Sequence, residues 1–193
     1  MIDLGNGVHI RANACCFILC LRKVGAGRAE NSAPAYYETF LGILKRAQEL
    51  SGGACLNQQI SEISETDAVI KDSAKWSGAP VDFKNGLHMK RFGCNIMLHE
   101  GEKKVSIRRK KRRSKASLYS NPCFYCTASQ AIQGALNLSM RKAIIADNMT
   151  FDEALSLYKF MAHDFLENAG KATKRCKANL NDKQMNAAVL KAY

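Results

Sequence analysis

The sequence contains little proline, little tryptophan and few acidic side chains. Of its 193 residues, 3 are proline and 1 is tryptophan. So few prolines argue against long irregular linkers. Asp and Glu number 17 against 29 Lys and Arg, which gives a net charge of +12. A positive excess of this size favours an anionic partner.

A hydrophobic run long enough to cross a bilayer is also missing. The longest apolar segment, residues 14–21, falls far short of the about 20 residues that a spanning helix needs. The opening residues, MIDLGNGVHIRAN, are too polar for a secretory signal peptide. Eight cysteines without such a signal indicate free thiols. We therefore expect an intracellular protein in a reducing compartment, either the cytoplasm or a nucleus.

The remaining composition is typical of a folded protein. Hydrophobic residues make up 47% of the chain, and a chain of this length can bury one sizeable core. We expect a single domain over residues 1–193. The alternative is a division into a mixed α/β part, 1–122, and a helical part, 123–193. The sequence shows us no internal repeat, and it leaves the oligomeric state open.

The residue patterns predict an α+β fold with a β-rich middle packed against a helical C-terminal part. Residues 14–22 have the apolar, β-branched and aromatic character of a strand. A helix is expected to begin at Ser32 and Pro34 and to end at 51–53. Residues 81–107 are expected to be β-structure with a hairpin turn at Asn85 and Gly86.

The C-terminal third has the clearest helical pattern. Apolar residues at helical spacing predict a helix over 127–146. Thr150 and Glu153 form a capping box, which marks the start of a second helix. That helix is expected to end at Gly170, and a last one is expected to begin at Asn181.

Most of the excess positive charge, nine of the net +12, lies in one segment, residues 103–115, which we call the basic segment. Each phosphate that a Lys or Arg neutralises releases a counterion, so cations in series bind nucleic-acid backbones. We therefore expect a protein that binds DNA or RNA without cleaving it, through a basic arm on the hairpin. The cations of the basic segment are Lys103, Lys104, Arg108, Arg109, Lys110, Lys111, Arg112, Arg113 and Lys115.

Several alternatives to nucleic-acid binding stay open for the basic segment. A Lys/Arg octamer also resembles a nuclear localisation signal. It also suits an anionic membrane surface or an acidic protein, or it is a solvated loop without a partner. A structural component of a virion or a ribonucleoprotein particle would use the same charge to neutralise packaged nucleic acid. If nucleic acid is the partner, Arg91 and the cluster Lys171–Lys177 are expected to extend the contact. Tyr119, Phe124 and Tyr125 lie close by in the sequence, and their rings are candidates for stacking on bases.

The pair Cys123 and Cys126 follows the basic segment and suggests a zinc site. Zinc needs four ligands, and thiolate and imidazole are the side-chain groups that it prefers. The nearest further ligands in the sequence are Cys94 and His99. A site made of Cys94, His99, Cys123 and Cys126 would join the hairpin to the first C-terminal helix.

Other interpretations of these two cysteines need no metal. The sequence Cys123-Phe-Tyr-Cys126 between a strand and a helix is similar to the active-site turn of the glutaredoxin and thioredoxin families. That resemblance implies redox activity, but it also implies a later cis-proline, and Pro122 is the last proline here. Cys123 or Cys126 is alternatively a nucleophile with His99 or His163 as its base, or both are inert thiols.

A metal-dependent nuclease is the alternative enzyme. Two-metal phosphodiester cleavage needs converging carboxylates and a nearby lysine. Pro80-Val-Asp82 and Glu102-Lys-Lys104 resemble the corresponding pattern of restriction-type nucleases. In this alternative Asp82, Glu102 and Lys104 would be catalytic.

Overall fold

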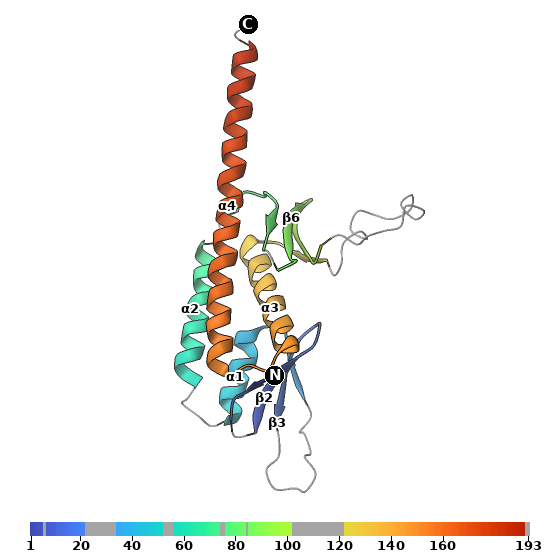
Figure 1. Ribbon diagram of the computed structural model, residues 1–193, viewed down its shortest axis with the longest axis vertical. Helices are drawn as coiled ribbons and strands as arrows, with labels where there is room; N and C mark the ends of the chain where they lie inside the picture. The colour runs from blue at the N-terminus through green and yellow to red at the C-terminus, as the bar shows by residue number, and fades with distance from the viewer. Residues whose placement is uncertain are drawn as a thin grey trace, which may run out of the picture. The chain divides into compact units, whose positions relative to one another are not determined.

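The computed structural model describes residues 1–5, 7–21, 34–51, 56–73, 76–83, 85–101 and 122–191, with side chains described as far as Lys174 in the last helix. The predictions for Glu102 and for the basic segment therefore lie outside the described residues. The described chain forms two antiparallel sheets of four strands each, together with four helices (Figure 1). The strands are β1 (Ile2–Asp3), β2 (Val8–Ala12), β3 (Phe17–Leu21), β4 (Ala35–Tyr37), β5 (Val81–Asp82), β6 (His88–Phe92), β7 (Asn95–His99) and β8 (Cys123–Tyr125). The helices are α1 (Phe40–Ser51), α2 (Asn57–Ser73), α3 (Ala128–Ala146) and α4 (Phe151–Lys191).

The α+β class is confirmed, with strands in the middle of the chain and helices at its C-terminal end. The predicted strand at 14–22 is β3, and the turn at Asn85 and Gly86 connects β5 with β6. The sheet β1–β4, which we call the first sheet, was not predicted as a sheet. The second sheet, β5–β8, is the predicted β-rich middle. No helix in the described part of the chain is both long and apolar enough to cross a bilayer.

The predicted helix start at Ser32 and Pro34 is wrong. Residues 35–37 form β4, which pairs with β3 (Leu19 with Ala35), and α1 begins only at Phe40. Thr39 caps α1, because its Oγ1 accepts a hydrogen bond of 3.1 Å from the N–H of Gly42. The apolar spacing that indicated the helix is correct from Phe40 onward. Pairing with β3 decides the conformation of residues 35–37.

The capping box of α4 is confirmed, but the predicted end at Gly170 is wrong. The Thr150 N–H donates to Glu153 Oε2 over 2.7 Å, and the Glu153 N–H donates to Thr150 Oγ1 over 3.3 Å. The helix then runs unbroken to Lys191, past the predicted start at Asn181. A single glycine inside a helix costs only about 1 kcal/mol relative to alanine, so the turns on either side of Gly170 keep it helical.

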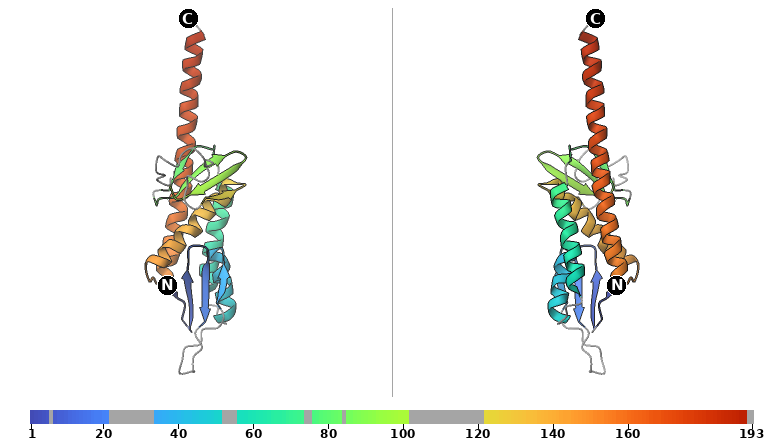
Figure 2. Two further views of the ribbon diagram at one scale, coloured as in Figure 1. Left: turned by 90° about the vertical axis from the view of Figure 1, so that its right-hand side faces the viewer. Right: turned by 90° about the vertical axis from the view of Figure 1, so that its left-hand side faces the viewer.

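The chain divides into two compact units, Met1–Val69 with Gln133–His163, and Ile70–Ile132 with Asp164 onward. In the first unit, aromatic rings connect the first sheet to α1 and α4. Phe17 lies 5.6 Å from Phe40, and Phe40 lies 5.5 Å from Tyr158 (ring centroids). All three side chains are fully buried. Two turned views show β2 and β3 side by side (Figure 2).

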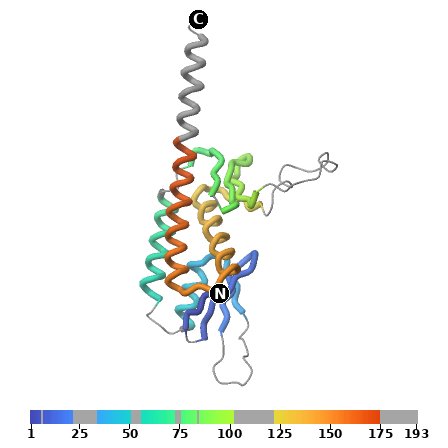
Figure 3. The backbone as a smooth tube through the Cα atoms, viewed as in Figure 1, coloured from blue at the N-terminus to red at the C-terminus, as the bar shows by residue number. Residues whose placement is uncertain are grey.

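The core of the second unit lies against one face of the second sheet. Val81, Met89 and Leu98 are buried on that face, and they pair across three strands in register. Phe83 adds a ring contact with Phe165 of α4, with centroids 4.6 Å apart. Figure 3 shows the backbone through β5, β6 and β7; residue 84, between β5 and β6, is not described.

The two sheets repeat each other in topology and register. Four strands in chain order are followed by two helices, and this order occurs twice. The N–H of Leu4 donates to the carbonyl of Val8 over 2.9 Å, and the N–H of Phe83 donates to that of Leu87 over 3.0 Å, at the same point of each sheet. The pair His9↔Cys20 of the first sheet is equivalent to His88↔His99 of the second. In the same way, Phe17↔Tyr37 is equivalent to Ile96↔Tyr125.

These registers reveal an internal repeat in the sequence, so our prediction of no repeat is wrong. Residues 2–20 align with 81–99 without a gap, and residues 34–39 align with 122–127. The segments between them differ in length, 21–33 against 100–121, so no single spacing aligns both halves. The identical pairs are Asp3/Asp82, Asn6/Asn85, Gly7/Gly86, His9/His88, Cys15/Cys94, Leu19/Leu98, Pro34/Pro122, Tyr37/Tyr125 and Thr39/Thr127.

Candidate nucleic-acid interface

The basic segment lies within the connection between two strands, residues 100–122. On one side β7 ends at His99, and on the other β8 begins at Cys123. These strands are antiparallel neighbours, and Leu98 pairs with Cys123. Hairpin connections usually have 2–5 residues, and residues 100–122 far exceed that length. Long connections of this kind in compact domains are commonly functional.

Other predicted cationic contacts lie on described elements. The guanidinium of Arg91, in β6, lies 5.8 Å from the ring centroid of Trp76. Lys171, in α4, forms an ion pair of 2.7 Å with Glu167, and Lys174 is exposed. The side chains of Arg175 and Lys177 lie outside the described part. Arg91 and Lys171 therefore already have partners within the chain.

The four predicted zinc ligands do not meet in this structure. Cys94 lies in the turn before β7 and His99 at the far end of that strand, so on the order of 15 Å of extended chain separates them. Zinc ligands lie within about 2.3 Å of the metal. Among the residues that the structure describes, no group of three or more His, Cys, Asp or Glu is placed to hold a metal ion. This arrangement gives the zinc prediction no support.

Cys123 and Cys126 are both exposed, Cys123 in β8 and Cys126 just before the capping residue of α3. That capping residue is Thr127, whose Oγ1 accepts a hydrogen bond of 3.2 Å from the N–H of Gln130. His99 is buried, and its Nδ1 accepts a hydrogen bond of 3.2 Å from the N–H of Gly101. His163 is an exposed residue of α4. The redox and nucleophile interpretations stay predictions.

Of the predicted nuclease residues, only Asp82 is described. It lies in β5, and its Oδ1 is 3.7 Å from Nδ1 of His88 on the adjacent strand. The rings of His88 and His99 stack with centroids 5.4 Å apart. These side chains, with Lys90, line a hollow of about 430 Å³. Glu102 and Lys104 lie outside the described residues, so the carboxylate pair stays a prediction.

The sequence indicated Phe124 and Tyr125 of β8 as rings that could stack on bases, but it did not indicate Phe92 or its contact with Phe124. Phe92 of β6 and Phe124 of β8 are both exposed, and their ring centroids lie 5.6 Å apart. Lys90 precedes Phe92 by two positions, so both point to the same face of the strand. Period-two alternation over 88–92 would have revealed this face. Phe124 could not be placed on the same face, because the sequence did not show that residues 123–125 form a strand beside β7.

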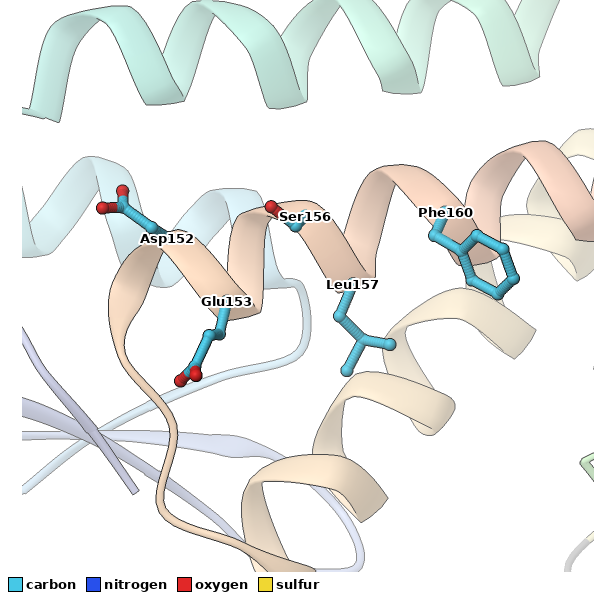
Figure 4. Close-up of a pocket in the computed structure, with 5 residues that line it drawn as sticks. All are labelled: Asp152, Glu153, Ser156, Leu157 and Phe160. Carbon is cyan, nitrogen blue, oxygen red and sulfur yellow. The ribbon is translucent and has the colours of Figure 1, made fainter.

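A second hollow, of about 520 Å³, lies on the first turns of α4 (Figure 4). Asp152, Glu153, Ser156, Leu157 and Phe160 line it. All five come from one helix, and no cluster of cations or metal ligands is among them. Neither hollow resembles an enclosed ligand pocket.

The chain matches no family model, no curated protein and no solved structure.

Proposed function

We propose that this chain binds nucleic acid without cleaving it, through contacts between the basic segment and the phosphate backbone. The observation that carries the proposal is the concentration of charge. Nine of the 29 Lys and Arg lie within residues 103–115, which contain no acidic residue. Holding so many like charges together costs electrostatic free energy, and phosphates relieve that cost.

The attachment of the basic segment supports the same proposal. The connection that contains it, residues 100–122, joins the neighbouring strands β7 and β8. A segment held at both ends on a sheet loses less conformational freedom on binding than a free terminal tail of the same length. Binding is expected to depend little on sequence, because phosphate contacts position a protein without reading bases.

The experiment measures binding of a labelled oligonucleotide as a function of salt concentration. Each phosphate contact contributes about −0.9 to the slope of log K against log salt on duplex DNA, and about −0.7 on single strands. Replacing Arg108, Arg109 and Lys110 by Gln is expected to weaken binding and to reduce that slope by about 2–3.

A charge-matched control separates local contact from overall charge. The variant with Lys45, Lys71 and Lys142 replaced by Gln loses the same three charges from exposed helix positions. It is expected to bind nearly as tightly as the parent, because these residues lie outside the basic segment. Equal losses in the two variants would show that only net charge matters, and the proposal would then fail.

Intact recovery of the bound oligonucleotide tests the absence of cleavage. After incubation with Mg²⁺ the strand is expected to be full length. Cleavage that EDTA stops and Asp82→Asn abolishes would replace the proposal by the nuclease alternative.

Sizing chromatography with and without nuclease treatment would reveal a structural component of a virion or ribonucleoprotein particle, because its assemblies would fall apart once the nucleic acid is digested.

A further inference from the structure

Each sheet carries three residues in register on one of its faces, and we call these three residues the outer row. In the first sheet the outer row is Arg11, Ile18 and Tyr36. Their neighbours in sequence, such as Ile10 and Phe17, are buried on the opposite face. Because directly paired residues point to the same side of a sheet, a cation, an aliphatic residue and an aromatic ring lie side by side. Arg11 is exposed, and Tyr36 is 62% exposed.

The outer row of the second sheet has a cation, an apolar residue and an aromatic ring at the equivalent positions. It consists of Lys90, Met97 and Phe124. Phe124 is 46% exposed, and its ring meets that of Phe92 across β7. Met97 pairs with Phe124 in register and is fully buried. This sheet therefore presents a larger aromatic surface than the first.

The internal repeat makes this agreement informative. Core positions agree between the halves because packing restricts them, but an exposed position has no such restriction. The two halves nevertheless keep a cation at Arg11 and Lys90 and an exposed ring at Tyr36 and Phe124. Arg11 is exposed and Lys90 is half-buried, and a cation in register with an exposed aromatic ring in both halves indicates a binding surface.

We propose that the two outer rows are equivalent surfaces on which the bases of a single-stranded nucleic acid stack. This inference rests on the proposed function and names the form of nucleic acid. An aromatic ring stacks on a base of any identity, and cations beside it neutralise the phosphates. The rings of Tyr36 and Phe124 supply the stacking surface, and Arg11 and Lys90 lie two strands away in the same row.

The dimensions of the sheets favour a single strand over a duplex. Four strands span about 14 Å between the outermost strand axes. The major groove of DNA is about 12 Å wide and admits a helix or a two-stranded ribbon, so neither sheet face fits into it. The bases of a duplex also stack on one another, which leaves their faces unavailable. Unpaired bases are available to Tyr36 and Phe124.

The test measures how exposed aromatic residues affect binding of the full chain to oligo(dT) and oligo(rU) of about 20 nucleotides, long enough to cover such a site. Tyr36→Ala and Phe124→Ala are each expected to weaken single-strand binding by roughly 5-fold to 150-fold. A duplex of the same length is expected to bind these variants and the parent alike. Tyr36→Phe and Phe124→Tyr keep a ring and are expected to bind like the parent.

Phe160→Ala is the matched control, because Phe160 is the most exposed aromatic residue among those described and lies on α4, outside both sheets. It is expected to leave binding unchanged. A direct readout comes from Phe124→Trp, whose added fluorescence is expected to be quenched by oligo(dT), whereas that of Phe160→Trp is not. Circular dichroism and urea unfolding confirm that the variants fold, as expected for exposed positions.

The outcomes separate this inference from the proposed function. If Tyr36→Ala, Phe124→Ala and their combination bind single strands like the parent, the inference is overturned. Loss of binding on replacing Arg108, Arg109 and Lys110 would in that case still support the proposed function. If the parent binds neither single strands nor duplex, both are overturned.

Discussion

Gly7 and Gly86 adopt the same left-handed backbone conformation, with φ angles of 75° and 79°. They occupy equivalent positions in the repeat, each directly before a buried residue, Val8 or Leu87. Side chains of L residues crowd the following carbonyl in this conformation. Glycine avoids that crowding, and the turn that follows the first strand of each sheet depends on it.

Replacing either glycine by alanine is therefore expected to destabilise the fold. Gly86→Ala should lower the free energy of unfolding by about 1–2 kcal/mol, and Gly7→Ala by a similar amount. No atom lies within 4 Å of a Cβ added at Gly86, so the loss there comes from the backbone. Urea unfolding measures both values.

Gly170→Ala is the control for this prediction, because the same change occurs inside α4. A Cβ at Gly170 likewise meets no atom within 4 Å. Alanine is favoured over glycine in a helix by about 0.5–1 kcal/mol, so this variant is expected to be more stable than the parent. Changes of the same sign in all three variants would contradict the explanation by backbone conformation.

Asn137 of α3 supports the first turn of α1. Its Oδ1 accepts a hydrogen bond of 2.9 Å from the N–H of Phe40, and its Nδ2 donates to the carbonyl of Gln133 over 2.9 Å. Asn137 is buried, and the first amides of a helix have no partner within the helix. Asn137→Ala is expected to lower the free energy of unfolding by about 1–3 kcal/mol.

Asn168→Ala provides the matched comparison in α4. The side chain of Asn168 donates to Asp164 Oδ2 over 2.9 Å at a part-buried position. That bond lies within one helix, and alanine is the better helix former, so the expected change is below about 0.5 kcal/mol. Equal losses at Asn137 and Asn168 would show that the contact with Phe40 has no special role.

The pair of half-buried Asp67 and buried Tyr158 makes stability depend on pH. Tyr158 donates its hydroxyl hydrogen to Asp67 Oδ1 over 2.6 Å. Burial raises the pKa of Asp67 above its ordinary value, although this hydrogen bond opposes the shift. The folded state then binds a proton more tightly than the unfolded state. Stability should therefore fall as pH rises from the ordinary pKa of Asp67 through the raised one.

Asp67→Asn is expected to remove this part of the pH dependence, because the amide does not titrate and still accepts a hydrogen bond from Tyr158. Tyr158→Phe removes the hydrogen bond that lowers the pKa of Asp67, so it should move the fall in stability to higher pH. Urea unfolding at intervals from about pH 3 to pH 7 measures both effects. A parent and an Asp67→Asn variant with equal slopes would contradict the assignment to Asp67.

Local signals predicted the elements that depend on nearby residues. The capping box at Thr150 and Glu153 and the turn at Asn85 and Gly86 were correct, since each involves residues close together in sequence. The helix start at Pro34 was wrong because β4 exists only through pairing with β3. A strand of three residues has no periodicity of its own, and the same is true of β8.

The internal repeat likewise became recognisable only from the strand pairing. Nine identical pairs are present in the two halves of the sequence, but unequal connections between the third and fourth strands shift the halves relative to each other. The shared register of β2 with β3 and of β6 with β7 supplied the alignment. The candidate site follows the same pattern, because Phe92 and Phe124 are distant in sequence and adjacent in the sheet.

The sequence by itself determined the α+β class, the excess of positive charge and its concentration in residues 103–115, because composition and local spacing are sufficient for these. Only the tertiary structure decided that the connection containing this segment joins two neighbouring strands. It also decided that each sheet has a cation and an exposed aromatic ring in register on one face. The physical reason is that strand pairing is non-local. Which side chains share a face depends on register, and register forms only when distant segments meet.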